Sequence, residues 1–204
     1  MSHYPKIPDY STWESVTKRA FYRGQVQPIG RWVRGVVLDV GSNYGRFSSL
    51  SESTISLDID KRSLTRGIEL GNIRSAVVGS AVDLAFKREC FDTVLAIGVT
   101  EHIPRSLMGR FLDELTRVTR LGGTLVIQTA SPYAVFSLSR IRIWSDCLHP
   151  YSPFRLRREL RRRGWLHTGW ISSGLVGITP VFPDTANGLV PWAVAVTQIL
   201  VRGT

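Results

Sequence analysis

Short apolar runs alternate with amphipathic segments along most of the chain. Each run is rich in β-branched residues and is bounded by glycine or polar residues, which predicts strands. These runs cover residues 35–40, 54–59, 75–79, 91–98 and 124–130.

The clearest helix is expected over 105–120. Its apolar residues recur at helical spacing: Leu107, Phe111, Leu112, Leu115 and Val118. The Leu-Gly-Gly run at 121–123 is expected to end it. Shorter helical segments are expected over 44–52 and 61–71.

The N-terminal part is expected to be helical. Ser11 and Glu14 have the spacing of a capping box, which predicts a helix through residue 23. A second short helix is expected over 26–33, although Gly30 weakens it.

The last third of the chain predicts a helix and two final strands. Ser152 as N-cap and Pro153 at the first position begin a helix over 153–163. The final strands are expected at 165–173 and 193–203. The segment between them, 174–191, contains three prolines and three glycines and is expected to be a long loop.

Alternating strands and helices predict an α/β fold. We expect a Rossmann-like, doubly wound, mostly parallel seven-stranded sheet with helices on both faces and an antiparallel final strand. A single domain over 1–204 is expected, with an N-terminal helical lid (1–34), a cofactor-binding half (35–130) and a substrate-side half (131–204). Ligands of such sheets bind at the carboxyl ends of the strands.

Composition narrows the setting of the protein. Cys90 and Cys147 form no metal pattern or disulfide framework, which favours a reducing, cytoplasmic location. No secretory signal is visible, and the apolar stretch 188–201 is too short to span a membrane and is expected to be a buried strand with its lead-in. The net charge of +10 suits anionic partners, although a solvated surface explains it equally simply.

The turn after the first strand, residues 39–47, reads "DVGSNYGRF". It lacks the G-x-G-x-x-G of dinucleotide folds and the lysine-containing signature of P-loops, so NAD, FAD and ATP are disfavoured. Asp39, Gly41, Asn43 and Gly45 instead occupy alternate positions. Asn43 suits a left-handed position, because asparagine tolerates that conformation better than other non-glycine residues.

This turn resembles motif I of the class I S-adenosylmethionine-dependent methyltransferases, in a small, single-domain, type 11-like form. Four later segments resemble further family motifs in the same order: 77–86, 91–104 ("FDTVLAIGVTEHIP"), 121–130 and 149–165. The resemblance implies S-adenosyl-L-methionine as cofactor, with S-adenosyl-L-homocysteine as product and no metal. The cofactor-binding residues that it implies are Asp39, Gly41, Asn43, Gly45, Asp58, Ile59, Ser80, Ala81, Val82, Ile97, Gly98, Val99 and His102.

The resemblance also implies roles for these residues. Gly41 and Gly45 would let the backbone approach the cofactor, Asp39 would face its cationic end, and Asp58 would accept hydrogen bonds from its ribose hydroxyls. Ser80 stands where the family often has an acidic residue for the adenine amine. Asp83 lies three residues later, so Ser80 and the backbone of Ala81 and Val82 are expected to replace that contact.

Three residues are candidates for the acceptor side of the site. His102 follows the fourth strand and could orient or deprotonate a methyl acceptor. Tyr133 and His149 fall where the family builds its substrate wall. Each of the three has a structural alternative, as a packing or loop-ordering residue, and His167 is expected to be structural.

The substrate class stays open at this stage. The motif "GVTEHIP" in place of the [D/N]-P-P-[Y/F] of many nucleic-acid amino-methyltransferases favours a small or lipid-like metabolite. Six arginines within 155–163 keep open an RNA or protein methyltransferase and a peripheral membrane contact. A non-catalytic cofactor-binding scaffold is the alternative from another class.

Overall fold

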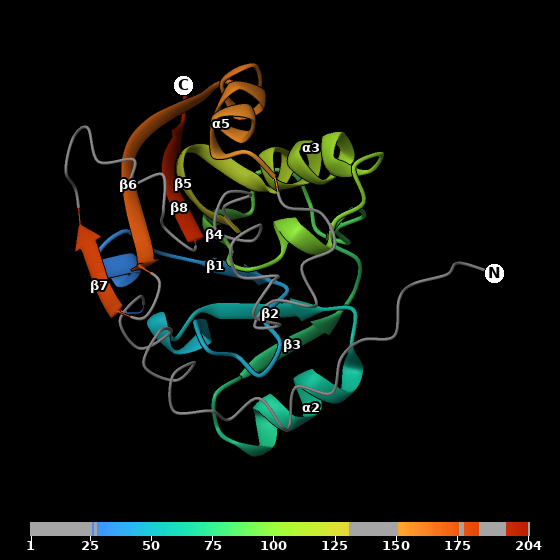
Figure 1. The fold of residues 1–204 in the computed structure, drawn as a ribbon. Helices are drawn as coiled ribbons and strands as arrows, with labels where there is room; N and C mark the ends of the chain where they lie inside the picture. Colours follow the sequence, from blue (N-terminus) through green and yellow to red (C-terminus); the bar gives the residue numbers. More distant parts are fainter. Residues whose placement is uncertain (1–25, 27, 131–150, 176–177, 184–194, 204) are drawn as a thin grey trace.

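The computed structural model describes residues 26, 28–130, 151–175, 178–183 and 195–203. Its strands form one sheet with the order β3-β2-β1-β4-β5-β8-β6-β7 (Figure 1). The strands are β1 (Val37–Val40), β2 (Thr54–Asp58), β3 (Ser75–Val78), β4 (Phe91–Ala96), β5 (Thr119–Ala130), β6 (Trp165–Leu175), β7 (Ile178–Pro183) and β8 (Ala195–Arg202).

The pairing of the strands confirms the expected fold class. β3, β2, β1, β4 and β5 are parallel neighbours, and β8 lies antiparallel between β5 and β6. β8 also accounts for the C-terminal apolar stretch, because Thr197, Gln198, Ile199 and Leu200 are fully buried. Among the described residues, no helix is long and apolar enough to cross a membrane.

The sheet has eight strands rather than the expected seven, because β7 lies within the segment predicted as a loop. β7 pairs antiparallel with β6 and forms the edge of the sheet. Its sequence, "ITPVFP", contains two prolines. Proline lacks the N–H that a central strand would need, but an edge strand tolerates proline. The two prolines are therefore the reason that a loop was expected where the structure has a strand.

Three α-helices and two short 3-10 helices connect the described strands. They are α2 (Lys61–Glu69), α3 (Met108–Val118), α5 (Pro153–Arg161), η2 (Ser48–Leu50) and η3 (Thr100–His102). Helix α3 ends at Val118, earlier than expected, and the Leu-Gly-Gly run falls within the range of β5. The β4–β5 register shifts between Phe91 and Thr93, so the glycines mark an irregular start of the strand.

Two apolar clusters cover the two faces of the sheet. On one face, α3 and α5 pack on β1, β4 and β5 through residues that include Phe111, Leu115, Leu156 and Leu160, all with 0% exposure. On the other face, Ile29 from the helical residues 28–30 packs with side chains of β1, β4, β5, β6 and β8. The predicted helix over 11–23 lies outside the described residues.

Candidate active site

The loop after β1 turns through a left-handed backbone. The φ angles of Gly41, Asn43 and Gly45 are +68°, +51° and +75°. The amides of Gly41 and Ser42 donate to the carbonyl oxygen of Leu57 at 2.7 and 3.0 Å, which closes the loop on the end of β2. The left-handed conformation expected for Asn43 is therefore confirmed.

Packing within the protein already requires the two glycines of this loop. A Cβ atom on Gly41 would lie 2.3 Å from Val99 Cγ2, and one on Gly45 would lie 2.3 Å from Ile73 Cγ1. The sequence interpretation attributed the glycines to close approach of a cofactor. The structure gives a reason that holds without a ligand, and it places the β1 loop directly against the loop that follows β4.

Asp58 joins the ends of three strands. Its Oδ2 accepts the amide of Asn43 and its Oδ1 that of Asp60, both at 2.9 Å. The amide of Gly79, after β3, donates to the carbonyl oxygen of Asp58 at 3.0 Å. Burial raises the pKa of Asp58, and the backbone donors around it oppose that rise.

Asp39 is only 2% exposed. Ser48 Oγ donates to Asp39 Oδ2 at 3.0 Å and lies 2.7 Å from Ser56 Oγ. Burial raises the pKa of Asp39 to about 7, and the hydrogen bond from Ser48 partly offsets the rise. The sequence reasoning missed both serines, although a serine at an inward position of β2 is the signal that could have revealed them.

Substituting Asp39 with asparagine is expected to stabilise the protein increasingly as the pH rises from about 4 to about 7. A carboxyl whose pKa is raised by folding binds more protons in the folded state, so stability falls with rising pH across that window. Asparagine does not titrate, so the free energy of unfolding of the variant relative to the wild type should rise by about 1.4 kcal/mol for each pH unit of the window. Thermal denaturation of both proteins at pH 4, 5.5 and 7 measures the difference, and a constant difference would contradict the expectation.

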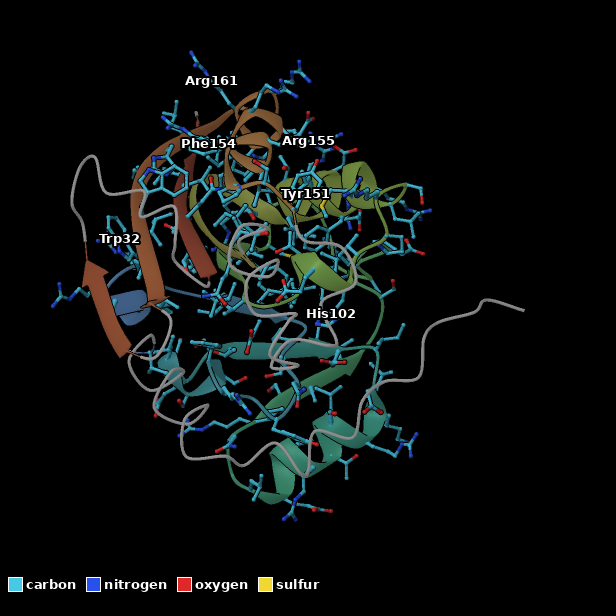
Figure 2. The ribbon with its side chains drawn as sticks, viewed as in Figure 1. Trp32, His102, Tyr151, Phe154, Arg155 and Arg161 are labelled. Carbon is cyan, nitrogen blue, oxygen red and sulfur yellow. The ribbon has the colours of Figure 1, made fainter. Side chains whose placement is uncertain are left out.

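The end of β4 carries the motif "GVTEHIP". Gly98 has a φ of +70°, and η3 follows, anchored by a hydrogen bond from Thr100 Oγ1 to the carbonyl oxygen of Gln128. Glu101 is 5% exposed, and burial raises its pKa to about 7. His102 is exposed, and its amide donates to the carbonyl oxygen of Val99 at 2.9 Å. Figure 2 shows His102 well apart from α5.

The turn after β3 places Asp83 beside α3. The carboxylate of Asp83 lies 3.3 Å from the guanidinium of Arg110 on α3. Ser80 holds the turn, since its carbonyl oxygen accepts the amide of Asp83 at 3.1 Å. Ala81 and Val82 are partly buried against the core. Tyr133 and His149 lie outside the described residues.

His167 lies in β6, as expected, and has a structural environment. Its ring contacts that of Trp170 in a tilted arrangement, with centroids 4.3 Å apart and an interplanar angle of 47°. Burial, with a smaller contribution from Arg157, lowers its pKa to about 4. His167 is therefore neutral at physiological pH.

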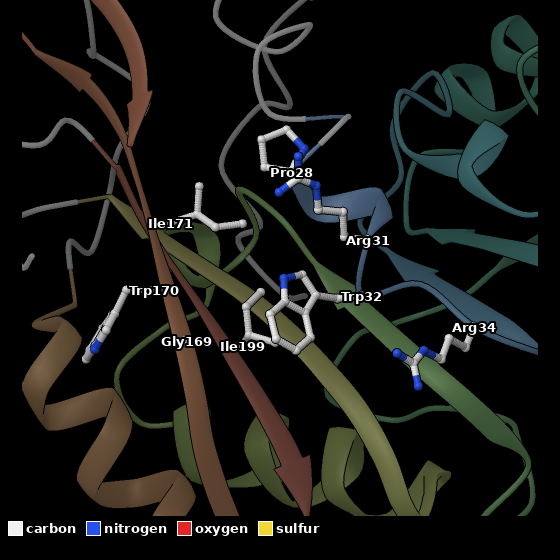
Figure 3. A pocket seen from close by; sticks show the side chains of 8 residues that line it. All are labelled: Pro28, Arg31, Trp32, Arg34, Gly169, Trp170, Ile171 and Ile199. Carbon is white, nitrogen blue, oxygen red and sulfur yellow. The ribbon is translucent and has the colours of Figure 1, made fainter. Parts of the chain in front are cut away.

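A pocket of about 200 Å³ lies on the face of the sheet that Ile29 covers (Figure 3). Trp32, Ile171 and Ile199 supply apolar surface, and Arg31 and Arg34 supply positive charge. None of the residues predicted to bind the cofactor lines it. The pocket is therefore separate from the cluster at the ends of β1, β2 and β4.

Residues 38–127 match the family model described as a methyltransferase domain. This match supports a class I S-adenosylmethionine-dependent methyltransferase domain over these residues. A search of curated protein sequences found no match. A domain of this kind supports an enzyme that transfers methyl groups.

Solved methyltransferase structures share the fold at low sequence identity. A methyltransferase from Thermotoga maritima, described as a possible histamine N-methyltransferase, has a TM-score of 0.76 at 19% identity, covering 96% of this chain and 95% of that one. One from Archaeoglobus fulgidus has a TM-score of 0.73 at 16% identity, covering 96% and 100%. Magnesium protoporphyrin IX methyltransferase from Synechocystis, solved with bound SAH, has a TM-score of 0.67 at 15% identity, covering 93% and 88%.

The site of this methyltransferase has polar atoms that fit a polar cofactor. Five buried side-chain atoms have no hydrogen-bond partner among the described residues. Two of them, His167 Nε2 and Gln198 Oε1, lie in β6 and β8, and the other three are Ser42 Oγ, Asn43 Oδ1 and Glu101 Oε2. Buried polar atoms are rarely left unpaired, because the loss of hydration is not compensated. All three lie on the loops after β1 and β4, which meet where Gly41 packs against Val99.

Proposed function

We propose that this methyltransferase transfers the methyl group of S-adenosyl-L-methionine to a small or lipid-like metabolite. The observation that carries the proposal is the conformation of "GVTEHIP" at the end of β4. Thr100 is bonded to the strand and Glu101 is buried, so His102 is the exposed side chain of η3. The sequence of this short turn, with its one exposed histidine, differs from the [D/N]-P-P-[Y/F] motif found at the same place in many nucleic-acid amino-methyltransferases.

We further propose that the cofactor lies across the ends of β1, β2 and β4. Asp58 would accept the ribose hydroxyls, and the exposed Ile59, at 46%, would offer an apolar surface beside them. Asn43 Oδ1 and Ser42 Oγ would hydrogen-bond to the methionine end. Ser80, Ala81, Val82, Ile97, Gly98 and Val99 would complete the adenine side of the site.

The chemistry follows from this arrangement. S-adenosylmethionine supplies a methyl group on a positively charged sulfur, and the transfer is an in-line displacement. The residues of the chain hold the acceptor in line and exclude water from the site. His102 would orient the acceptor or accept the proton that the acceptor loses. Burial raises the pKa of the neighbouring Glu101 to about 7, and the charge of this carboxyl would change the electrostatic potential around the acceptor.

Calorimetry followed by a transfer assay tests the proposal. We expect micromolar binding of S-adenosylmethionine and S-adenosylhomocysteine, and then transfer of labelled methyl groups into the lipid or small-metabolite fraction of a cell extract. The His102→Gln variant should lower kcat about 100-fold or more, a typical contribution of proton transfer, with a smaller effect on the Kd of the cofactor. Label in the RNA or protein fraction would contradict the substrate class, and no binding of either ligand would contradict the whole proposal.

The division of the chain and its location belong to the same proposal. We infer one domain over 1–204, since one sheet joins strands from β1 to β8. The lid expected over 1–34 stays a prediction for residues 1–25, because Ile29 packs on the sheet and Trp32 lines the separate pocket. The free thiol of Cys90 is consistent with a reducing, cytoplasmic setting.

A further inference from the structure

The outer face of α5 is strongly basic and carries one exposed aromatic ring. Leu156 and Leu160 face the core with 0% exposure. Phe154, Arg158 and Arg161 have the i, i+4, i+7 spacing that places them together on the opposite face. Phe154 is 54% exposed, so its ring is accessible on this face. Figure 2 shows Arg161 at the outer end of the helix and Phe154 and Arg155 on different sides of it.

The charge of this face is not neutralised by the neighbouring acids. Arg162 pairs with Glu159, and Arg163 pairs with Glu159 and Asp113. The other four arginines of α5 are Arg155, Arg157, Arg158 and Arg161. In the part of the chain that the structure describes, no acidic group lies within 4.0 Å of their guanidinium groups. These four positive charges are available to an anionic partner.

Two arginines of the face are held in place by aromatic rings. Arg155 lies 5.3 Å above the centroid of Tyr151, and Arg157 lies 5.7 Å above that of Trp170. These contacts orient the guanidinium groups. Only Phe154 then offers an uncovered aromatic ring on α5.

The start of α5 is tied to the sheet. Thr129 Oγ1, near the carboxyl end of β5, donates to the carbonyl oxygen of Tyr151 at 2.8 Å. Gln198 Nε2 on β8 donates to the carbonyl oxygen of Pro153 at 2.9 Å. A partner that binds the first turns of α5 would therefore be held in a fixed position relative to the edge of the sheet that carries the site.

We propose that this face, defined by Phe154, Arg155, Arg157, Arg158 and Arg161, docks the enzyme on an anionic lipid surface. The guanidinium groups bind lipid phosphates, and Phe154 enters the interfacial region between the headgroups. A convex helix with a single free ring suits a flat charged surface better than RNA, whose single strands are bound in grooves with several stacking rings. The proposal concerns binding alone and does not depend on the identity of the methyl acceptor.

Sedimentation with vesicles tests the docking. Full-length protein without cofactor is mixed with vesicles of phosphatidylcholine containing 30–40% phosphatidylglycerol, or of phosphatidylcholine alone. We expect binding to the anionic vesicles only, weakened by salt as screening predicts. Arg155→Glu/Arg158→Glu should reduce binding about tenfold or more, and Phe154→Ala about threefold or more.

The substitutions are chosen so that the helix keeps its fold. Glutamate at 155 stands three residues after the N-cap Ser152, the position that completes a capping box. The matched control is Arg62→Glu/Arg66→Glu on α2, at the opposite end of the molecule, which changes the net charge by the same amount (Figure 1). Equal loss in both double variants would show that net charge alone drives binding and would overturn the proposal.

Two further outcomes would also overturn it. One is the absence of binding to anionic vesicles at low salt. The other is binding to RNA that Arg155→Glu/Arg158→Glu abolishes while vesicle binding is unchanged, since that result would assign the face to nucleic acid. Circular dichroism of each variant confirms that a loss of binding does not reflect unfolding.

Discussion

Replacing Asp58 with alanine is expected to raise the Kd for S-adenosylmethionine about 100-fold. The substitution would remove the proposed contacts with the ribose hydroxyls, and hydrogen bonds to a charged group contribute about 1.5–3 kcal/mol each. It would also release the amide of Asn43, which Asp58 Oδ2 holds at 2.9 Å, so the β1 loop would lose its tie to β2. Isothermal calorimetry on the purified variant measures the change.

Asp60 provides the matched control for this prediction. It is the N-cap of α2, where its side chain accepts the amide of Arg62 at 3.1 Å and the hydroxyl of Ser63 at 2.9 Å. Asp60→Ala should lower stability by about 1 kcal/mol through the lost cap and change the cofactor Kd less than threefold. If Asp58→Ala and Asp60→Ala weakened binding equally, or if neither did, the role assigned to Asp58 would be wrong.

The parts of the site that depend on backbone conformation could be predicted from the sequence. The alternate spacing of Asp39, Gly41, Asn43 and Gly45 predicted a tight turn, and the left-handed Asn43 confirms it. The strand pattern predicted a mostly parallel sheet, because burial on both faces leaves continuous apolar runs. These features are local, so a short stretch of sequence specifies them.

Features that depend on tertiary contacts could not be predicted in the same way. The Asp39–Ser48–Ser56 network joins β1, η2 and β2, and no local pattern reveals which serines meet. The pairing of Asp83 with Arg110 depends on how α3 packs beside the β3 turn. The strand β7 was missed for a different reason, since its prolines contradict the composition of a central strand while an edge accepts them.

The burial of Glu101 is a third feature that could not be predicted from the sequence. Glu101 and His102 are adjacent polar residues after β4. The turn of η3 gives them opposite environments, with Glu101 at 5% exposure and His102 exposed. A difference of one position in a 3-10 turn changes the direction of a side chain by about a third of a revolution, which sequence patterns resolve poorly.

The Gly41→Ala substitution is expected to destabilise the protein by about 2–4 kcal/mol, since a left-handed alanine costs about 1–2 kcal/mol and overpacking against Val99 costs about as much again. For a chain of this size the Tm should fall by about 5–15 °C. Gly71→Ala is the matched control, because Gly71 has a similar φ of +73° but nothing within 4 Å of an added Cβ. It should therefore show the conformational cost alone.

Val99→Ala tests the contact directly, because it removes the Cγ2 atom that an added Cβ on Gly41 would meet at 2.3 Å. In the background of Val99→Ala, the destabilisation by Gly41→Ala should shrink to that of Gly71→Ala. The difference is the coupling energy of a double-mutant cycle, expected at about 1–2 kcal/mol. Additive effects of Gly41→Ala and Val99→Ala would mean that the β1 and β4 loops do not meet as the structure shows. A positive coupling would establish that the loop packing, independently of any ligand, requires glycine at this position.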